Sequence, residues 1–129
     1  MSRKPWEVHK CIIMMVVHKN DVIPHFRDCM ASIFESLAHV GTHYRFKLCI
    51  RADGHVNNDF RSIISSYERD INIDFQTSYP SKGLTKNLND IIKGNPDVEY
   101  YFRIDPDDLN FENRFNQQLE YMSQNEHLH

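Results

Sequence analysis

The chain has 129 residues, enough for one domain with a single buried core. Its formal net charge is -3 and no segment concentrates lysine and arginine, so we expect no nucleic-acid partner. The N-terminus lacks the apolar stretch of a signal peptide, and no apolar run is long enough to span a bilayer. We therefore expect a cytoplasmic protein, either free or peripherally attached to the inner face of the membrane.

The first predicted elements are a buried strand and an amphipathic helix. The run Cys11–Val17 is continuously apolar, which is typical of a strand buried on both faces. Pro24 suits the start of a helix, and apolar residues keep helical spacing as far as Leu37. Gly41 follows where a helix stop is expected.

Alternation between strand and helix patterns continues through the rest of the chain. The segment Ile71–Phe75 alternates apolar and polar residues, which predicts a more exposed edge strand. The segment Glu99–Ile104 is apolar and aromatic, and we expect it to lie centrally in the sheet. The pattern favours a three-layer α/β domain whose mostly parallel sheet has helices on both faces. The other predicted elements are a strand at 46–50 and helices at 58–69, 84–93 and 111–123.

The residues most suggestive of chemistry follow the last predicted strand. Asp105, Asp107 and Asp108 bring three carboxylates together, and like charges this close repel unless a cation lies among them. Carboxylate oxygens are preferred ligands of Mg²⁺, Mn²⁺ and Ca²⁺. Alternatively, Asp107 or Asp108 caps a helix beginning near Asn110, with Pro106 shaping the turn. One cap needs one carboxylate, so the cluster favours a metal site.

A second acidic residue, Asp53, follows another predicted strand and precedes Gly54. Because parallel strands end at the same edge of a sheet, Asp53 and the three later aspartates are expected to face one crevice. An aspartate in this position can accept a hydrogen bond from a nucleobase while the glycine admits the ligand. An ordinary Asp-Gly turn is the alternative. The three cysteines do not suggest a disulfide framework, and we expect free, buried thiols at Cys11, Cys29 and Cys49.

Four segments, in order, resemble the nucleotide-binding half of family 2 glycosyltransferases, which have the GT-A fold. The first, His18–Asp21, follows the first strand, and Ile50–Gly54 is similar to the family's V-D-D-G-S. The third is Lys82–Asn89. The last, Arg103–Asp108 leading to Asn113–Arg114, resembles the family's R-x-D-A-D-D…N-R. The resemblance covers nearly the whole chain.

The resemblance implies a hexosyltransferase-type enzyme that uses a nucleoside-diphosphate sugar and an unknown acceptor, as in polysaccharide biosynthesis. UDP- and dTDP-sugars are the favoured donors, and Mn²⁺ or Mg²⁺ is the implied cofactor. Residues 1–129 would be a single nucleotide-sugar-binding domain that stops before the acceptor-binding half, where the general base is expected. The alternative is a non-catalytic module that binds a nucleoside diphosphate or another protein.

The family pattern also assigns roles to individual residues. Asp53 would contact the N3 edge of a pyrimidine, and Asp107 would lie near the ribose and sugar. Asp107 and Asp108 would be the metal ligands, with Asp108 the more direct, while Asp105 is either a ligand or a support for one. The remaining residues of the donor site would be His18 against the base and, near the diphosphate, Lys82 and Lys86, which are alternatively solvated lysines at a helix end.

The chain departs from the family pattern at four positions. Val17 and His18 stand where the family usually has a Tyr-Asn pair, so the stacking tyrosine is missing and His18 is the substitute we consider. Ala52 replaces the first aspartate of V-D-D-G-S, and His55 replaces the serine. These departures leave the base preference open.

Overall fold

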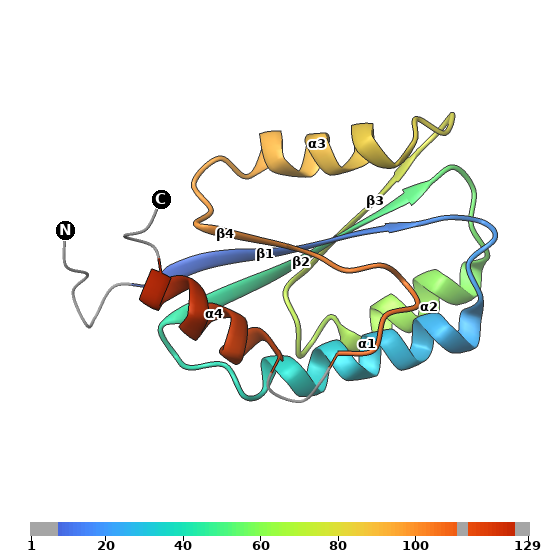
Figure 1. Ribbon diagram of the computed structural model, residues 1–129. Helices are drawn as coiled ribbons and strands as arrows, with labels where there is room; N and C mark the ends of the chain where they lie inside the picture. Colours follow the sequence, from blue (N-terminus) through green and yellow to red (C-terminus); the bar gives the residue numbers. More distant parts are fainter. Residues whose placement is uncertain (1–7, 111–113, 126–129) are drawn as a thin grey trace.

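The computed structural model describes residues 8–110 and 114–125, and these form a sheet between two layers of helices (Figure 1). Strands and helices alternate along the chain, as the sequence pattern predicts. The elements are β1 (His9–Val17), α1 (Ile23–Leu37), β2 (Tyr44–Asp53), α2 (Asn58–Tyr67), β3 (Ile73–Ser78), α3 (Leu84–Gly94), β4 (Tyr100–Arg103) and α4 (Arg114–Asn125). The predicted start of the last helix, 111–113, lies outside the described residues.

The four strands are all parallel, in the order β3-β2-β1-β4. The longest pairing joins β1 to β2, with His9 opposite Tyr44 and Val17 opposite Ala52. The prediction that the segment at 71–75 forms an edge strand is confirmed, although β3 starts at Ile73. The prediction that the aromatic strand lies centrally is wrong. Within the described chain, β4 pairs with β1 alone and forms the other edge of the sheet.

Two hydrophobic clusters cover the two faces of the sheet. The larger joins sheet residues such as Ile13 and Leu48 to side chains from α1, α2 and α4, among them Phe26 and Phe115. The smaller joins Ile12 and other residues of the opposite face to α3. Because β1 is apolar at almost every position, it supplies both clusters, and this places helices on both faces as predicted. Figure 1 shows α3 alone on one side of the sheet.

Several smaller features agree with the sequence analysis. Pro24 lies in the first turn of α1, and the three cysteines are buried and free. The N-terminus of α2 is capped by Asn57, whose side chain accepts a hydrogen bond from the Asp59 N–H at 2.8 Å. No helix within the described ranges combines the length and apolar character needed to cross a membrane.

Candidate functional site

An open hollow of about 300 Å³ lies at the edge of the sheet where the parallel strands end; we call it the strand-end hollow. It brings together four of the predicted site residues, which lie at or just beyond the ends of three different strands. Asp108, Lys82 and Lys86 are not among its lining residues. The lining consists of Val16, His18, Asp21, Asp53, Leu84, Arg103, Asp105, Pro106 and Asp107.

Asp53, the last residue of β2, is held in one orientation by its hydrogen bonds. Only 8% of its surface is exposed. Its Oδ1 accepts hydrogen bonds from the Lys82 N–H at 2.8 Å, the Gly83 N–H at 3.2 Å and the Asn87 side-chain amide at 3.0 Å. Burial opposes ionisation of Asp53, but these three donors outweigh it and hold its pKa below the ordinary value. The side chain is therefore a fixed anion at the rim of the hollow.

The same aspartate anchors the loop between β3 and α3, residues 79–83. Ser81 Oγ donates a hydrogen bond to the Asp53 carbonyl at 3.3 Å, and the Gly54 N–H donates to the Ser78 carbonyl at 2.7 Å. Gly54 has a φ of 87°, and a Cβ there would lie 2.5 Å from Ser81 Oγ. The Asp-Gly pair thus forms a turn, as one alternative predicted, and that turn also shapes the rim of the hollow.

Asn87 is a site residue whose role was not predicted from the sequence. It is completely buried on α3. Its side-chain amide donates to Asp53 Oδ1 and to the Gly83 carbonyl, and its Oδ1 accepts a hydrogen bond from Ser78 Oγ at 3.2 Å. Asn87 lies one helical turn before Ile91 on the buried stripe of α3. The sequence feature that could have identified Asn87 is a polar residue at a core position of a helix.

The segment Asp105–Asp108, which we call the acidic turn, is bonded within itself. Asp108 Oδ2 accepts a hydrogen bond from the Asp105 N–H at 2.9 Å, and the Asp108 N–H donates to the Asp105 carbonyl at 3.0 Å. Asp105 Oδ1 lies 3.4 Å from the guanidinium of Arg103, which also lines the hollow. Asp107 is exposed and lines the hollow. Asp108 thus stabilises the turn, while Asp107 faces the open space.

Helix α1 supports the acidic turn from behind. The Cys29 thiol donates to the Asp105 carbonyl at 3.5 Å, and Ser32 Oγ accepts from both the backbone and side-chain N–H groups of Asn110 at 3.0 Å. Burial raises the pKa of Cys29 to about 12, and the nearby Asp108 and Asp107 add to that rise. Such a thiol stays protonated at neutral pH, so its role here is structural.

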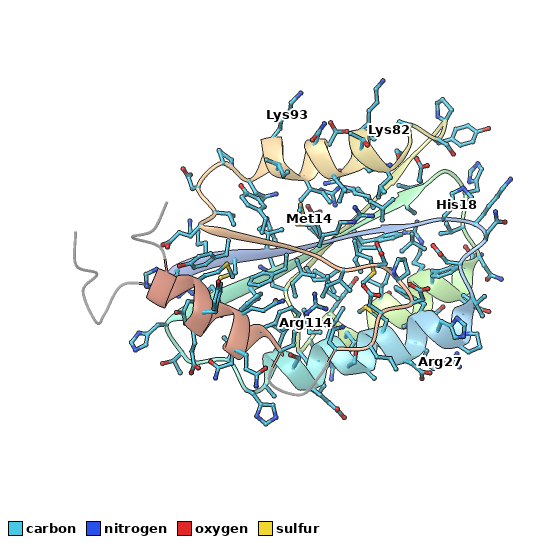
Figure 2. The ribbon with its side chains drawn as sticks, in the orientation of Figure 1. Met14, His18, Arg27, Lys82, Lys93 and Arg114 are labelled. Atoms are coloured by element: carbon cyan, nitrogen blue, oxygen red, sulfur yellow. The ribbon has the colours of Figure 1, made fainter. Side chains whose placement is uncertain are left out.

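The three remaining predicted residues lie at or near the same end of the molecule. His18 is exposed at the end of β1, where its Nδ1 accepts a hydrogen bond from the Asn20 N–H at 3.3 Å. Figure 2 shows His18 and Lys82 at the same end of the sheet. The Lys82 ammonium pairs with Asp90 of α3, and Lys86 is exposed on that helix.

The carboxylates of the acidic turn are a partial donor set for a metal. Within residues 8–110 and 114–125, no three His, Cys, Asp or Glu side chains lie close enough together to hold an ion. Mg²⁺ is commonly held by one or two carboxylates, with phosphate oxygens and water completing its shell. The exposed carboxylate of Asp107 suits that arrangement, and the described residues alone do not supply a complete metal cage.

This fold is that of GT-A-like glycosyltransferases. Two crystal structures of the glycosyltransferase TarS from S. aureus superimpose closely on the chain. For the longer, the TM-score is 0.72 at 13% sequence identity, covering 91% of this chain and 20% of that one. For TarS 1–349 in complex with UDP, the TM-score is 0.71 at 14% identity, covering 92% of this chain and 33% of that one.

The sequence is similar to a curated glycosyltransferase. The bifunctional glycosyltransferase pgtA of Dictyostelium discoideum is 33% identical over 88 residues, which are 66% of this chain and 11% of that protein. The chain therefore spans about a tenth of the length of this relative. No model of a known protein family matches the chain.

Proposed function

We propose that this chain is the donor-binding part of a family 2-like glycosyltransferase and binds a nucleoside-diphosphate sugar together with Mn²⁺ or Mg²⁺. The observation that carries the proposal is the strand-end hollow, where Asp53 and His18 face the carboxylates of Asp105 and Asp107 across the ends of three strands. The GT-A-like fold and the TarS structure with bound UDP support it. A UDP- or dTDP-sugar is the donor we favour.

Each side of the hollow suits a different part of such a donor. Asp53 is a fixed carboxylate acceptor, which matches the N3–H of uracil or thymine and disfavours cytosine, whose N3 is itself an acceptor. On the other side, Asp107 would hold the metal from the hollow. Asp108 does not line the hollow and would add its second oxygen from within the acidic turn, with Asp105 as a third ligand or a support. A bound divalent ion supplies Lewis-acid stabilisation of the charge on the departing diphosphate.

Two lysines complete the proposed diphosphate site. Lys86 is exposed on α3 and free to extend toward an anion at the hollow, whereas Lys82 must first leave Asp90. That exchange costs little because both side chains are near the surface, where water screens the ion pair. Asp90 thus keeps Lys82 at the start of α3 until a more strongly charged partner binds.

Calorimetric titration with UDP, dTDP, GDP and CMP, each with Mn²⁺ and then with EDTA, tests the proposal. We expect UDP or dTDP to bind in the presence of Mn²⁺ and to lose most of that affinity with EDTA. Asp107→Asn should have the same effect as EDTA. Asp97→Asn is the matched control, because Asp97 is also exposed but lies between α3 and β4, at the edge where strands begin.

The result also distinguishes the alternatives. Binding that ignores both EDTA and Asp107→Asn would support a non-catalytic nucleotide-binding module, and no binding of any nucleotide would refute the donor site. Transfer to an acceptor requires a general base, which we place outside residues 1–129. We therefore expect this chain to show slow hydrolysis of UDP-sugars at most, measured as release of free UDP.

A further inference from the structure

Two aromatic side chains meet just beyond the ends of β2 and β3. His55 follows Gly54, and Tyr79 follows Ser78. Their ring centroids are 4.4 Å apart, with planes inclined by 42°. Tyr79 is 72% exposed, the largest fraction among the exposed large hydrophobic residues in the described chain. An aromatic ring stabilises a fold by being buried, and this ring is not buried. Its surface is therefore available to a ligand.

The backbone that carries these two rings is fixed. The Gly54 N–H donates to the Ser78 carbonyl at 2.7 Å, which joins the residue before His55 to the residue before Tyr79. On the other side of Tyr79, Ser81 Oγ donates to the Asp53 carbonyl at 3.3 Å. The ring pair is therefore held on a bonded turn, and ordering it for a ligand costs less entropy than ordering a free loop.

The order of the strands places this pair at one end of the proposed donor site. The acidic turn follows β4, and the sheet order β3-β2-β1-β4 puts β1 between it and Asp53 at the end of β2. With strands about 4.8 Å apart, the acidic turn lies about 10 Å from the end of β2 and about 14 Å from that of β3. A nucleotide with its phosphates at the acidic turn and its base at Asp53 reaches toward β3, where Tyr79 stands.

We propose that Tyr79, supported by His55, is the stacking surface for the nucleobase; this inference rests on the proposed function. Val17, one of the residues in place of the family's Tyr-Asn pair, is completely buried and presents no surface to a base. The other, His18, has its ring engaged through Nδ1 with the turn that follows β1. Tyr79 supplies the flat apolar surface from the other side of Asp53.

Calorimetry with UDP and inorganic pyrophosphate, both with Mn²⁺, tests this inference, because pyrophosphate lacks the base. Tyr79→Ala should weaken UDP binding by about 5-fold to 100-fold and leave pyrophosphate binding within about twofold. Tyr79→Phe keeps the ring and should bind UDP like the unmodified protein. Tyr121→Ala is the control, since Tyr121 is 67% exposed but lies on α4. Thermal unfolding of each variant checks that it is folded.

The other outcomes count against the inference in distinguishable ways. If the unmodified chain binds UDP and Tyr79→Ala binds it equally well, Tyr79 is not the stacking surface, although the proposed function stands. Equal weakening of UDP and pyrophosphate would show a general effect of the loop and overturn the inference. If His18→Ala weakened UDP binding but not pyrophosphate binding, and Tyr79→Ala changed neither, the stacking surface would be His18. If the unmodified chain binds no nucleotide, both proposals fail.

Discussion

Asp53 and the acidic turn face the same hollow but differ in burial and in hydrogen bonding. Three donors converge on one oxygen of Asp53, and the residue is almost completely buried. In the acidic turn, Asp105 and Asp107 are exposed, and one carboxylate, that of Asp108, closes the turn on itself. Asp53 therefore contributes to stability as well as to the site, whereas Asp107 contributes little to stability.

This difference suits two kinds of ligand. A neutral nucleobase offers a single N–H in a fixed direction, which a carboxylate with one orientation recognises at little entropic cost. A hydrated divalent ion needs oxygens that can adjust their positions around it, and exposed carboxylates provide them. The comparison can be tested by changing each side separately.

The largest effect is expected at Asp53 itself. Asp53→Ala removes the acceptor of three hydrogen bonds and leaves the buried amide of Asn87 without that partner, so we expect a loss of about 3 kcal/mol in the free energy of unfolding. Asp53→Asn keeps an acceptor oxygen and should lose less than half as much. Urea denaturation measures both. Equal stability of Asp53→Ala and the unmodified protein would show that the loop does not depend on this carboxylate.

Gly54 should give the next largest effect. Gly54→Ala strains a backbone with a φ of 87° and places a methyl group against Ser81 Oγ, so we expect a loss of about 2 kcal/mol. Gly83→Ala is the matched control, because Gly83 has a φ of 89° but open space around it, and it should lose about 1 kcal/mol.

A double variant separates the two contributions at Gly54. Combining Gly54→Ala with Ser81→Ala removes the clashing hydroxyl. Measured against Ser81→Ala alone, which already lacks the bond to the Asp53 carbonyl, Gly54→Ala should then cost no more than Gly83→Ala. If Gly54→Ala lost no more stability than Gly83→Ala with Ser81 in place, Ser81 Oγ would not lie close to Gly54.

The acidic turn should show a smaller, graded response. Asp108→Ala loses the hydrogen bond to the Asp105 N–H and should cost about 1 kcal/mol, whereas Asp107→Ala should change stability by less than about 0.5 kcal/mol. Denaturant titrations without metal provide the comparison. A larger loss for Asp107→Ala than for Asp108→Ala would reverse the roles assigned within the turn.

The smallest effect is expected in the response to acid. Because the pKa of Asp53 is lowered by folding, its contribution to stability is complete above the unfolded pKa of about 3.9 and is lost as the pH falls through the lower folded pKa. Asp53→Asn should therefore flatten the fall in stability below about pH 4. Asp74→Asn, which removes another carboxyl with a lowered pKa, is the control for acid sensitivity from elsewhere. A fall in stability that Asp53→Asn left unchanged would show that Asp53 has no such pKa shift.

Much of the fold could be predicted from the chain because its strands and helices follow different apolar periods. The continuous apolar run of β1 indicated burial on both faces, and the structure confirms it. The same reasoning misplaced β4, because apolar side chains report what covers the faces of a strand and not which strands pair with its edges. Phe102 packs in the larger cluster and Tyr101 against the smaller one, although β4 has one neighbouring strand in the described sheet.

The site was predictable only where a residue's type and its place at a strand end suggest the same chemistry. Asp53, Asp105, Asp107 and Asp108 met both conditions. The structure brings the first three to one hollow, whereas Asp108 bonds within the acidic turn. Asn87 and Ser81 belong to the β3–α3 connection, and their bonds to Asp53 depend on how that loop folds back across β2. No periodic pattern encodes such a contact, because the partners are about 30 positions apart in the chain.

The parallel arrangement also defines a side of the domain that is open to alteration. All four strands start at the edge opposite the hollow, so the connections there, around Thr42, Asn72 and Asp97, take no part in the proposed chemistry. Affinity tags, fluorescent reporters or new chain ends from circular permutation can be introduced at those connections. Such variants would allow ligand binding to be followed from a distance.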